Sequence, residues 1–372
     1  MEDTKFLAVF RIVRHSLRLT GIDIFAENWR PNAWFIMCLT MLVIQPYVAL
    51  YFIVKYTDSI NLFAECISIM ISTLDALFGL VEFVVNRGAW NSVMQDVHDR
   101  RFMYKTQRMS ELFDRYYERN LFFVRVLYAI YMSTFSYCLL PLVISEPSKF
   151  NLPLPFILPH VDPSQQFFYP LNYIHHLLIS LVSQHVLIGQ CSALVIGVVS
   201  ACCQIEALKL QLEDLNEQIN DPAVKAATLR ESIVEIIKLH AATKEYISRI
   251  QKKYALVYLS MFVTCGVIVC MCLNVIADDF YNSAPFLMMA GGFSMLVHCF
   301  FGNKLLIAND SLPAAIYGID WYRLPIPEQK MIGFLLTNAQ RDALLNGVFM
   351  PLNMSSYLSI MKAAFSYYSI LN

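Results

Sequence analysis

The chain has 372 residues, of which 57% are hydrophobic and 15% are charged, whereas ordinary soluble domains have about 45–50% and about 25%. This excess of apolar residues excludes a typical soluble enzyme. The 28 Lys and Arg residues nearly balance the 29 Asp and Glu residues, which leaves a net charge of −1. No excess of positive charge therefore points to nucleic acid as a partner.

The first 32 residues place three arginines at helical spacing among apolar residues: Arg11, Arg14 and Arg18. This pattern predicts an amphipathic helix at about 4–20 that lies on the inner membrane surface. A short solvated lead-in helix would have a similar sequence.

Seven later stretches are nearly free of charge and long enough to cross a bilayer, which takes about 20 apolar residues. They predict an all-α membrane protein with seven transmembrane helices. The predicted spans are 33–54, 62–85, 121–144, 171–203, 254–277, 282–302 and 348–370.

The basic residues are distributed very unevenly between the segments that flank these spans. Twenty-four of the 28 basic residues lie either before span 1 or in the loops that follow spans 2, 4 and 6. The loops that follow spans 1, 3 and 5 hold only Lys55 and Lys149. The positive-inside rule then predicts a cytoplasmic amino terminus and an extracellular carboxyl terminus. A seven-span G-protein-coupled receptor has the opposite orientation.

The segment after span 4 continues a helical pattern into the cytoplasm. Apolar residues alternate three and four apart, as in a heptad seam, and the pattern ends at the turn signal 220–222. A second helix is expected to return from about Ala223 into span 5. The two helices can pack on each other and their neighbours, or on a second subunit. The seam consists of Ile205, Leu208, Leu212, Leu215 and Ile219.

The outer loop at 145–170 holds six of the chain's 15 prolines, interleaved with aromatic residues. Such a segment forms neither a helix nor a central strand. It can be an apolar lid over the outer mouth of a helix bundle or an ordinary connector, and the sequence leaves both open.

Polar residues in the spans do not form a recognisable catalytic or metal site. The four histidines in spans 4 and 6 lack carboxylate partners at ligand spacing, so we expect hydrogen-bonded groups between helices and no metal. The ten cysteines lie in apolar runs, which predicts neither a disulfide scaffold nor a zinc site. No nucleotide or hydrolase motif is present, so we expect no enzyme and no cofactor. These histidines are His175, His176, His185 and His298.

The outer half of the predicted bundle carries aromatic and Met-rich helix faces. Apolar surfaces with a few polar groups suit a volatile or lipid-like ligand, although the same residues can be plain core or interface belt. The residues in question are Tyr131 and Phe135 on span 3, Tyr173, His176 and Ser180 on span 4, and Tyr281, Phe286 and Met289 at the outer ends of spans 5 and 6.

The most specific pattern lies in the last 60 residues. It comprises Ser-Leu-Pro-Ala-Ala-Ile-Tyr at 311–317 with Trp321, Asn-Ala-Gln-Arg at 338–341, Phe-Met-Pro-Leu at 349–352 and Ser-Tyr-Tyr-Ser-Ile-Leu at 366–371. This segment resembles the carboxyl-terminal signature of the insect odorant receptor family. It departs from the family in having Asn346 where a small residue is common. It lacks the Gln-Phe ending of the gustatory receptors, and the loop 204–253 lacks the insertion of the family's co-receptor, which favours an odour-tuning subunit.

The resemblance implies a heterotetrameric, ligand-gated, non-selective cation channel formed with the odorant co-receptor in the plasma membrane of sensory neurons. It implies that span 7 lines the pore, with Ile370 at a hydrophobic gate and Ser366, Ser369 and Lys362 along the same helix. A gustatory-type receptor channel or a seven-span G-protein-coupled receptor is the alternative.

The resemblance also places the ligand among spans 2, 3, 4 and 6, which adds Met70 and Thr73 to the candidate residues. We expect a small, neutral, possibly aromatic volatile. The implied organisation begins with a cytoplasmic segment at 1–32, spans 1–4 in 33–203 and a cytoplasmic hairpin for assembly at 204–253. Spans 5 and 6 follow in 254–302, then a cytoplasmic anchor segment at 303–347 and a pore-lining helix at 348–372. Helices 4 to 6 extend into the anchor region.

Overall fold

The computed structural model describes residues 4–23, 26, 28–57, 59–103, 107–144, 152–161, 168–278, 283–341, 345–346 and 348–371. Within these ranges the regular structure is helical, apart from an isolated bridge between Asn346 and Pro351. The helices are α1 (Thr4–Leu19), α2 (Ala33–Tyr56), α3 (Ile60–Val85), α4 (Arg87–Met103), α5 (Gln107–Ile144), α6 (Tyr169–Asn220), α7 (Ala226–Asp278), α8 (Ala284–Tyr317), the short 3₁₀ helix η1 (Trp321–Arg323), α9 (Ile326–Ala339) and α10 (Met354–Leu371).

Six of the described helices are long and apolar enough to cross a membrane: α2, α3, α5, α6, α7 and α8. They contain the first five predicted spans in full and the sixth from Ala284 onwards. The seventh prediction was too long, because α10 begins only at Met354 and residues 348–353 are not helical. Pro351 has no N–H to donate to a helix, and the neighbouring Leu352 N–H donates instead to the Leu345 carbonyl at 2.8 Å.

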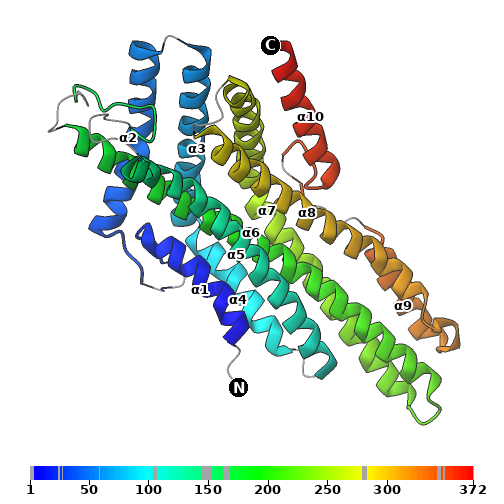
Figure 1. The fold of residues 1–372 in the computed structure, drawn as a ribbon. Helices are drawn as coiled ribbons and strands as arrows, with labels where there is room; N and C mark the ends of the chain where they lie inside the picture. Colours follow the sequence, from blue (N-terminus) through cyan, green and yellow to red (C-terminus); the bar gives the residue numbers. More distant parts are fainter. Residues whose placement is uncertain are drawn as a thin grey trace.

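Helix α6 runs through the middle of the bundle (Figure 1). Every residue from 182 to 205 is buried, because α1, α2, α3, α5, α7 and α8 all pack against this helix. A helix that is apolar on all sides is stable only in such a position. The central helix therefore supplies one wall to any cavity inside the bundle.

Two of the long helices continue well beyond their apolar parts, as the sequence predicts. Helix α6 reaches Asn220 and α7 starts at Ala226, three residues later than expected, since a turn in which Asp221 accepts a hydrogen bond from the Ala223 N–H intervenes. The heptad seam is buried inside the single chain: Leu208, Leu212 and Leu215 on α6 belong to the same core cluster as Ile233 and Ile236 on α7. Of the two alternatives, the seam therefore packs within the chain, and a second subunit needs another surface.

The segment between α8 and α10 is fixed to the tip of this helical hairpin. The Asp320 N–H donates to Asn216 Oδ1 at 2.7 Å, and the Asn220 side chain donates to Asp320 Oδ2 at 2.8 Å while it accepts from Arg323. The hydrogen bonds that Asn220 and Tyr322 donate to the Asp320 carboxylate hold its pKa below its usual value. Further along, the Lys244 ammonium donates to the Asn338 carbonyl at 2.6 Å.

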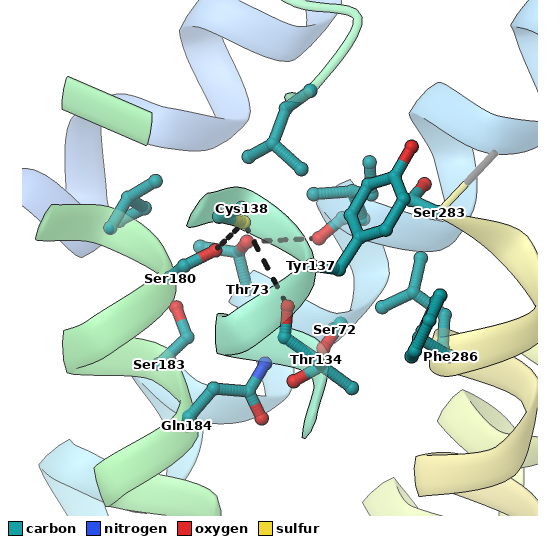
Figure 2. A pocket seen from close by; sticks show the side chains of 14 residues that line it. Ser72, Thr73, Thr134, Tyr137, Cys138, Ser180, Ser183, Gln184, Ser283 and Phe286 are labelled. Atoms are coloured by element: carbon teal, nitrogen blue, oxygen red, sulfur yellow. Dashed lines mark hydrogen bonds between the residues drawn. The ribbon is translucent and has the colours of Figure 1, made fainter. Parts of the chain in front are cut away.

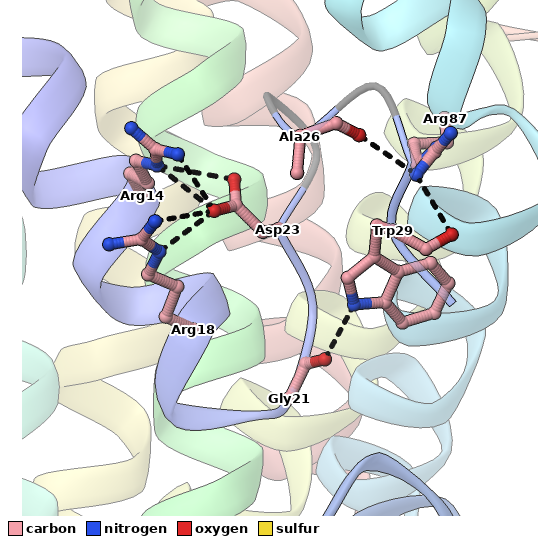
Figure 3. A network of polar contacts seen from close by, with 7 residues as sticks. All are labelled: Arg14, Arg18, Gly21, Asp23, Ala26, Trp29 and Arg87. Atoms are coloured by element: carbon pink, nitrogen blue, oxygen red, sulfur yellow. Dashed lines mark hydrogen bonds and ion pairs between the residues drawn. The ribbon is translucent and has the colours of Figure 1, made fainter. Parts of the chain in front are cut away.

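Helix α1 is amphipathic, as predicted, but its apolar face is covered by protein. Val13 and Leu17 are fully buried, and α1 packs on α5 and α6. Figure 3 shows that Arg14 and Arg18 both bind the Asp23 carboxylate, with ion-pair distances of 2.9 and 2.7 Å. Helix α1 is therefore part of the bundle. The ion pairs of Arg14 and Arg18 with Asp23 hold the following turn against the helix.

That turn depends on Gly21, whose φ is +84°. A Cβ there would lie 2.7 Å from the Phe35 backbone at the start of α2. The Gly21 carbonyl accepts a hydrogen bond from the Trp29 indole at 2.9 Å, and Arg87 donates to the Trp29 and Ala26 carbonyls (Figure 3). The amino-terminal segment is thus tied to α2 and α4.

Candidate ligand-binding site

A cavity lies between α3, α5, α6 and α8 (Figure 2). Its lining is mainly apolar, with several hydroxyl groups and one amide, as small-molecule sites usually are. The lining residues are Ile69, Ser72 and Thr73 from α3, Thr134, Tyr137 and Cys138 from α5, Leu154 from the outer loop, Ile179, Ser180, Ser183 and Gln184 from α6, and Ser283, Phe286 and Leu287 from the start of α8.

At the end of this outer cavity lined by Cys138 and Ser180, most hydroxyl groups already have hydrogen-bond partners. Thr73 and Thr134 donate to carbonyls of their own helices at 2.9 and 2.6 Å, and Cys138 Sγ lies 3.2 Å from Ser180 Oγ. Across from them, the rings of Tyr137 and Phe286 lie 5.2 Å apart and form an aromatic wall. These groups shape the cavity more than they offer hydrogen bonds to a ligand.

At the end of the outer cavity lined by Ser183 and Gln184, polar atoms lack hydrogen-bond partners among the described residues. Within the described part of the chain, Ser183 Oγ and Gln184 Oε1 are buried and have no hydrogen-bond partner. A buried polar atom without a partner costs about 1–3 kcal/mol. A ligand hydroxyl at this end would relieve that cost, so this is where the cavity can orient a polar group.

A second, inner cavity shares Ser72, Gln184 and Leu287 with the outer one. It is also lined by Asp75 and Tyr131. The Tyr131 hydroxyl lies 3.5 Å from Cys191 Sγ, which is itself 3.2 Å from Ser294 Oγ. Since the shared residues separate the two spaces, Gln184 is the polar boundary between them.

The described part of the long outer loop covers the outer cavity. Leu154 lines it, and Phe156 is fully buried with its ring 6.2 Å from that of Phe52. The Leu158 N–H donates to Asn172 Oδ1 at 2.8 Å, which fixes the loop to the start of α6. Residues 152–161 therefore agree with the interpretation of the outer loop as a lid over the bundle, and not with that of an ordinary connector.

Four of the predicted ligand residues line these cavities: Thr73, Ser180 and Phe286 line the outer one, and Tyr131 lines the inner one. Two more are buried beside the cavities without lining them. Tyr173 donates to the Cys138 carbonyl at 2.5 Å and joins α6 to α5, and His176 is fully buried. Tyr173 thus helps to hold the wall in place, whereas neither ring nitrogen of His176 has a hydrogen-bond partner among the described residues.

The other predicted ligand residues do not line either cavity. Met70 and Phe135 are half-buried, and Met289 is 43% exposed. On α5, Phe135 lies beside the residues that line the outer cavity, which are Thr134, Tyr137 and Cys138. Tyr281 lies outside the described residues.

Sequence analysis missed the polar residues of the site. Ser183 and Gln184 follow the predicted Ser180 at i+3 and i+4, which places all three on one helical face. A search for polar residues at this spacing inside span 4 would have found them. Ser72 was equally detectable, as the residue before Thr73.

The histidines make contacts within and between helices. His175 Nε2 lies 2.8 Å from Gln45 Oε1 on α2, whereas the ring nitrogens of His185 and His298 approach carbonyls of their own helices. No group of three His, Cys, Asp or Glu side chains suited to a metal ion was found among the described residues.

The predicted pore residues lie on the exposed side of α10. Lys362, Ser366, Ser369 and Ile370 are all exposed in the single chain, Ile370 to 76%. The opposite side of the helix packs on α7 and α8 through buried residues such as Ala364.

The family model described as 7tm odorant receptor matches residues 59–365 of this chain. Odorant receptor 10 of Aedes albopictus is 22% identical over 230 residues, which cover 59% of this chain and 60% of that protein. Odorant receptor 56a of Drosophila melanogaster is 21% identical over 143 residues, covering 37% and 34%. The alignments with these curated relatives thus span less than two thirds of their length.

The fold is similar to that of the insect olfactory receptor OR5 from Machilis hrabei, with a TM-score of 0.76, 15% identity and 97% of both chains covered. The structure of that receptor in complex with eugenol gives a TM-score of 0.78 at 16% identity and covers 98% of this chain and 97% of that one. Because the family model covers most of its length, the chain belongs to the insect odorant receptor family and is a multi-pass membrane receptor, not an enzyme.

Proposed function

We propose that this receptor is an odour-tuning subunit of a ligand-gated, non-selective cation channel, assembled with the odorant co-receptor as a heterotetramer in the plasma membrane of sensory neurons. A small neutral volatile binds in the outer cavity. Helix α10 crosses the membrane as the seventh span and lines a central pore, with the amino terminus in the cytoplasm and the carboxyl terminus outside.

The observation that carries this proposal is a polar stripe on α10. Five residues, spaced four, three, four and three apart, fall within roughly 80° of each other on a helix of 3.6 residues per turn. All five are exposed, on the side away from α7 and α8. Polar faces of membrane helices lie against water or other polar groups, and a central pore supplies water. The stripe is Ser355, Ser359, Lys362, Ser366 and Ser369.

Ile370 lies at the edge of this stripe, near the carboxyl end of α10. An exposed apolar side chain at the end of a polar stripe can close a pore by excluding water. This supports Ile370 as the gate, with one copy from each tuning subunit.

The cavity composition supports the ligand class. Tyr137 and Phe286 provide an aromatic wall, and Gln184 and Ser183 offer polar atoms at one end. No lining residue of the outer cavity carries a charge. A neutral volatile with one hydrogen-bonding group fits both features, and a related receptor fold has been solved with eugenol.

Two features support the tuning role and the assembly. The connection between α6 and α7 is a short turn from Asn220 to Ala226, without the insertion that the co-receptor carries. Apolar side chains on the anchor segment are exposed, including Tyr322, Ile326 and Phe334 at 59%, 69% and 61%. They can pack on another subunit, which the buried heptad seam cannot.

The test is co-expression with the co-receptor and recording of odorant-evoked current while G-protein signalling is blocked. A cation current that persists under the block is expected. An epitope tag on the amino terminus should be accessible only after permeabilisation. A current that disappears with the G-protein block, together with an externally accessible tag, would instead identify a G-protein-coupled receptor.

A further inference from the structure

A third cavity lies between α5, α6 and α8, far along these helices from the ligand site. Its lining combines three basic side chains with an aromatic floor and two hydroxyl groups. The residues that matter are Arg119 and Tyr116 on α5, Glu206 and Lys209 on α6, and Phe300, Lys304 and Ser311 on α8.

The charges of this basic cavity are not balanced. Lys209 pairs with Glu206 at 2.8 Å, but in the described part of the chain no carboxylate forms an ion pair with Arg119 or Lys304. The Lys304 ammonium instead lies 5.5 Å from the centre of the Phe300 ring. Two cations thus face the cavity with their charge available to an anion.

All three basic residues lie just beyond the ends of predicted spans. Arg119 comes two residues before predicted span 3, Lys304 two residues after span 6, and Lys209 six residues after span 4. On the proposed topology, these are the cytoplasmic ends of the three spans. The cavity therefore sits where the headgroups of the inner leaflet lie.

Beside the cations, the cavity has an apolar side. Ile307 is 55% exposed, and the rings of Phe300 and Phe301 lie 5.4 Å apart at the floor. A soluble anion would gain nothing from these groups, whereas a lipid would place its glycerol and upper acyl chains against them. Basic pockets between membrane helices on the cytoplasmic side are typical sites for phosphorylated lipid headgroups.

We propose that this basic cavity binds an anionic phospholipid with a multiply phosphorylated headgroup, held by Arg119, Lys209 and Lys304. The Tyr116 hydroxyl is placed to donate to headgroup oxygens, whereas Ser311 Oγ already donates to the Ala308 carbonyl at 2.7 Å. The inference rests on the proposed cytoplasmic orientation of this end of the bundle, but not on the odorant or on the pore.

The test uses the full-length chain in phosphatidylcholine nanodiscs and a fluorescent short-chain phosphatidylinositol bisphosphate, followed by anisotropy. Saturable binding is expected. Each of Arg119→Gln and Lys304→Gln should weaken it about fivefold, since a basic residue near a membrane surface contributes about 1 kcal/mol. The charge-preserving Lys304→Arg should bind as the wild type does. The control is Lys225→Gln, which removes an exposed cation in the turn between α6 and α7 and should change nothing.

Three results would overturn the proposal. Soluble inositol trisphosphate competing as well as the short-chain lipid would identify a pocket for a free anion. Phosphatidylserine competing equally well would remove the requirement for a multiply phosphorylated headgroup. Equal losses for Lys225→Gln and Lys304→Gln would mean non-specific attraction. Odorant-evoked currents measured on the same variants are separate, so a failure of lipid binding with intact currents would count against this inference alone.

Discussion

Gly302 on α8 and Leu352, just before α10, contact each other backbone to backbone. A Cβ on Gly302 would overlap the Leu352 carbonyl oxygen, so no other residue fits at this position without a shift. Leu352 is itself buried, at 2% exposed. The contact joins α8, which lines the ligand cavity at its other end, to the segment that leads into the proposed pore helix.

We therefore expect Gly302→Ala to impair channel opening. Inserting a methyl group into a packed contact typically costs about 1–3 kcal/mol, and here the strain would displace the start of α10. The measurement is the maximal odorant-evoked current, normalised to surface expression, and it should fall severalfold.

The same helix offers a matched control in Gly292, where an added Cβ would meet nothing within 4 Å. Gly292→Ala should leave the current unchanged and improve helix stability by up to about 1 kcal/mol. Equal effects of the two substitutions would show that the Gly302 contact has no special role.

The outer cavity predicts which aromatic residues set odorant sensitivity. Tyr137→Leu and Phe286→Leu each remove part of the aromatic wall, and a loss of about 1.4 kcal/mol in binding raises the half-maximal concentration about tenfold. Phe135→Leu, two residues from Tyr137 and outside the cavity, should have little effect. Dose–response curves for the best odorant decide between this face of α5 and the one predicted from the sequence.

Gln184 should determine the preference for hydrogen-bonding odorants. Its Oε1 has no partner in the described part of the chain, so a ligand hydroxyl gains a hydrogen bond worth about 0.5–1.5 kcal/mol. Gln184→Leu should weaken the response to an alcohol severalfold while leaving the response to an alkane of the same length intact. If both responses fall by the same factor, the side chain acts through cavity shape alone.

The long elements of this fold could be predicted from the sequence because each has a strong local cause. Apolar length predicted six of the crossing helices, and the heptad pattern predicted the extension of α6 to Asn220. The predicted start of the seventh span was wrong because a tertiary contact determines where α10 begins. The Leu352 N–H donates a hydrogen bond to the Leu345 carbonyl, and Leu352 packs on Gly302. Hydropathy alone treats residues 348–353 as part of the span.

The cavity residues were harder to predict because a helical face rotates by 100° with each residue. Tyr131 and Phe286 line cavities, whereas the predicted Phe135 does not and its neighbour on the helix, Tyr137, does. The partners of Arg14 and Arg18 also depend on the fold, since the turn at Gly21 brings Asp23 back to them. Such contacts have no signature in the sequence of one helix.

Lys362 lies at the middle of the polar stripe on α10, so it should limit cation flow. Lys362→Ser extends the run of serines and removes one positive charge from each tuning subunit. Near water-filled surfaces a charge at close range contributes about 1 kcal/mol, so the single-channel conductance for sodium should rise by up to about fivefold. The control is Lys330→Ser, an exposed cation on α9. Unchanged conductance, permeability and surface expression in Lys362→Ser would exclude this residue from the pore.

His240 on α7 should make the hairpin of α6 and α7 sensitive to acid. Its side chain is buried, at 6% exposed, and burial together with the nearby Lys244 charge lowers its pKa to about 4, from about 6.5 in an unfolded chain. The folded state therefore binds this proton less readily than the unfolded state, so the contribution of neutral His240 to stability is complete above about pH 6.5 and is lost as the pH falls towards 4. Thermal melting of the detergent-solubilised receptor at pH 7.5, 6 and 5 should show a melting temperature that falls with pH, and His240→Gln should reduce this slope. His15→Gln, at an exposed position on α1, should keep the wild-type slope. An unchanged slope in His240→Gln would show that other groups cause the acid sensitivity.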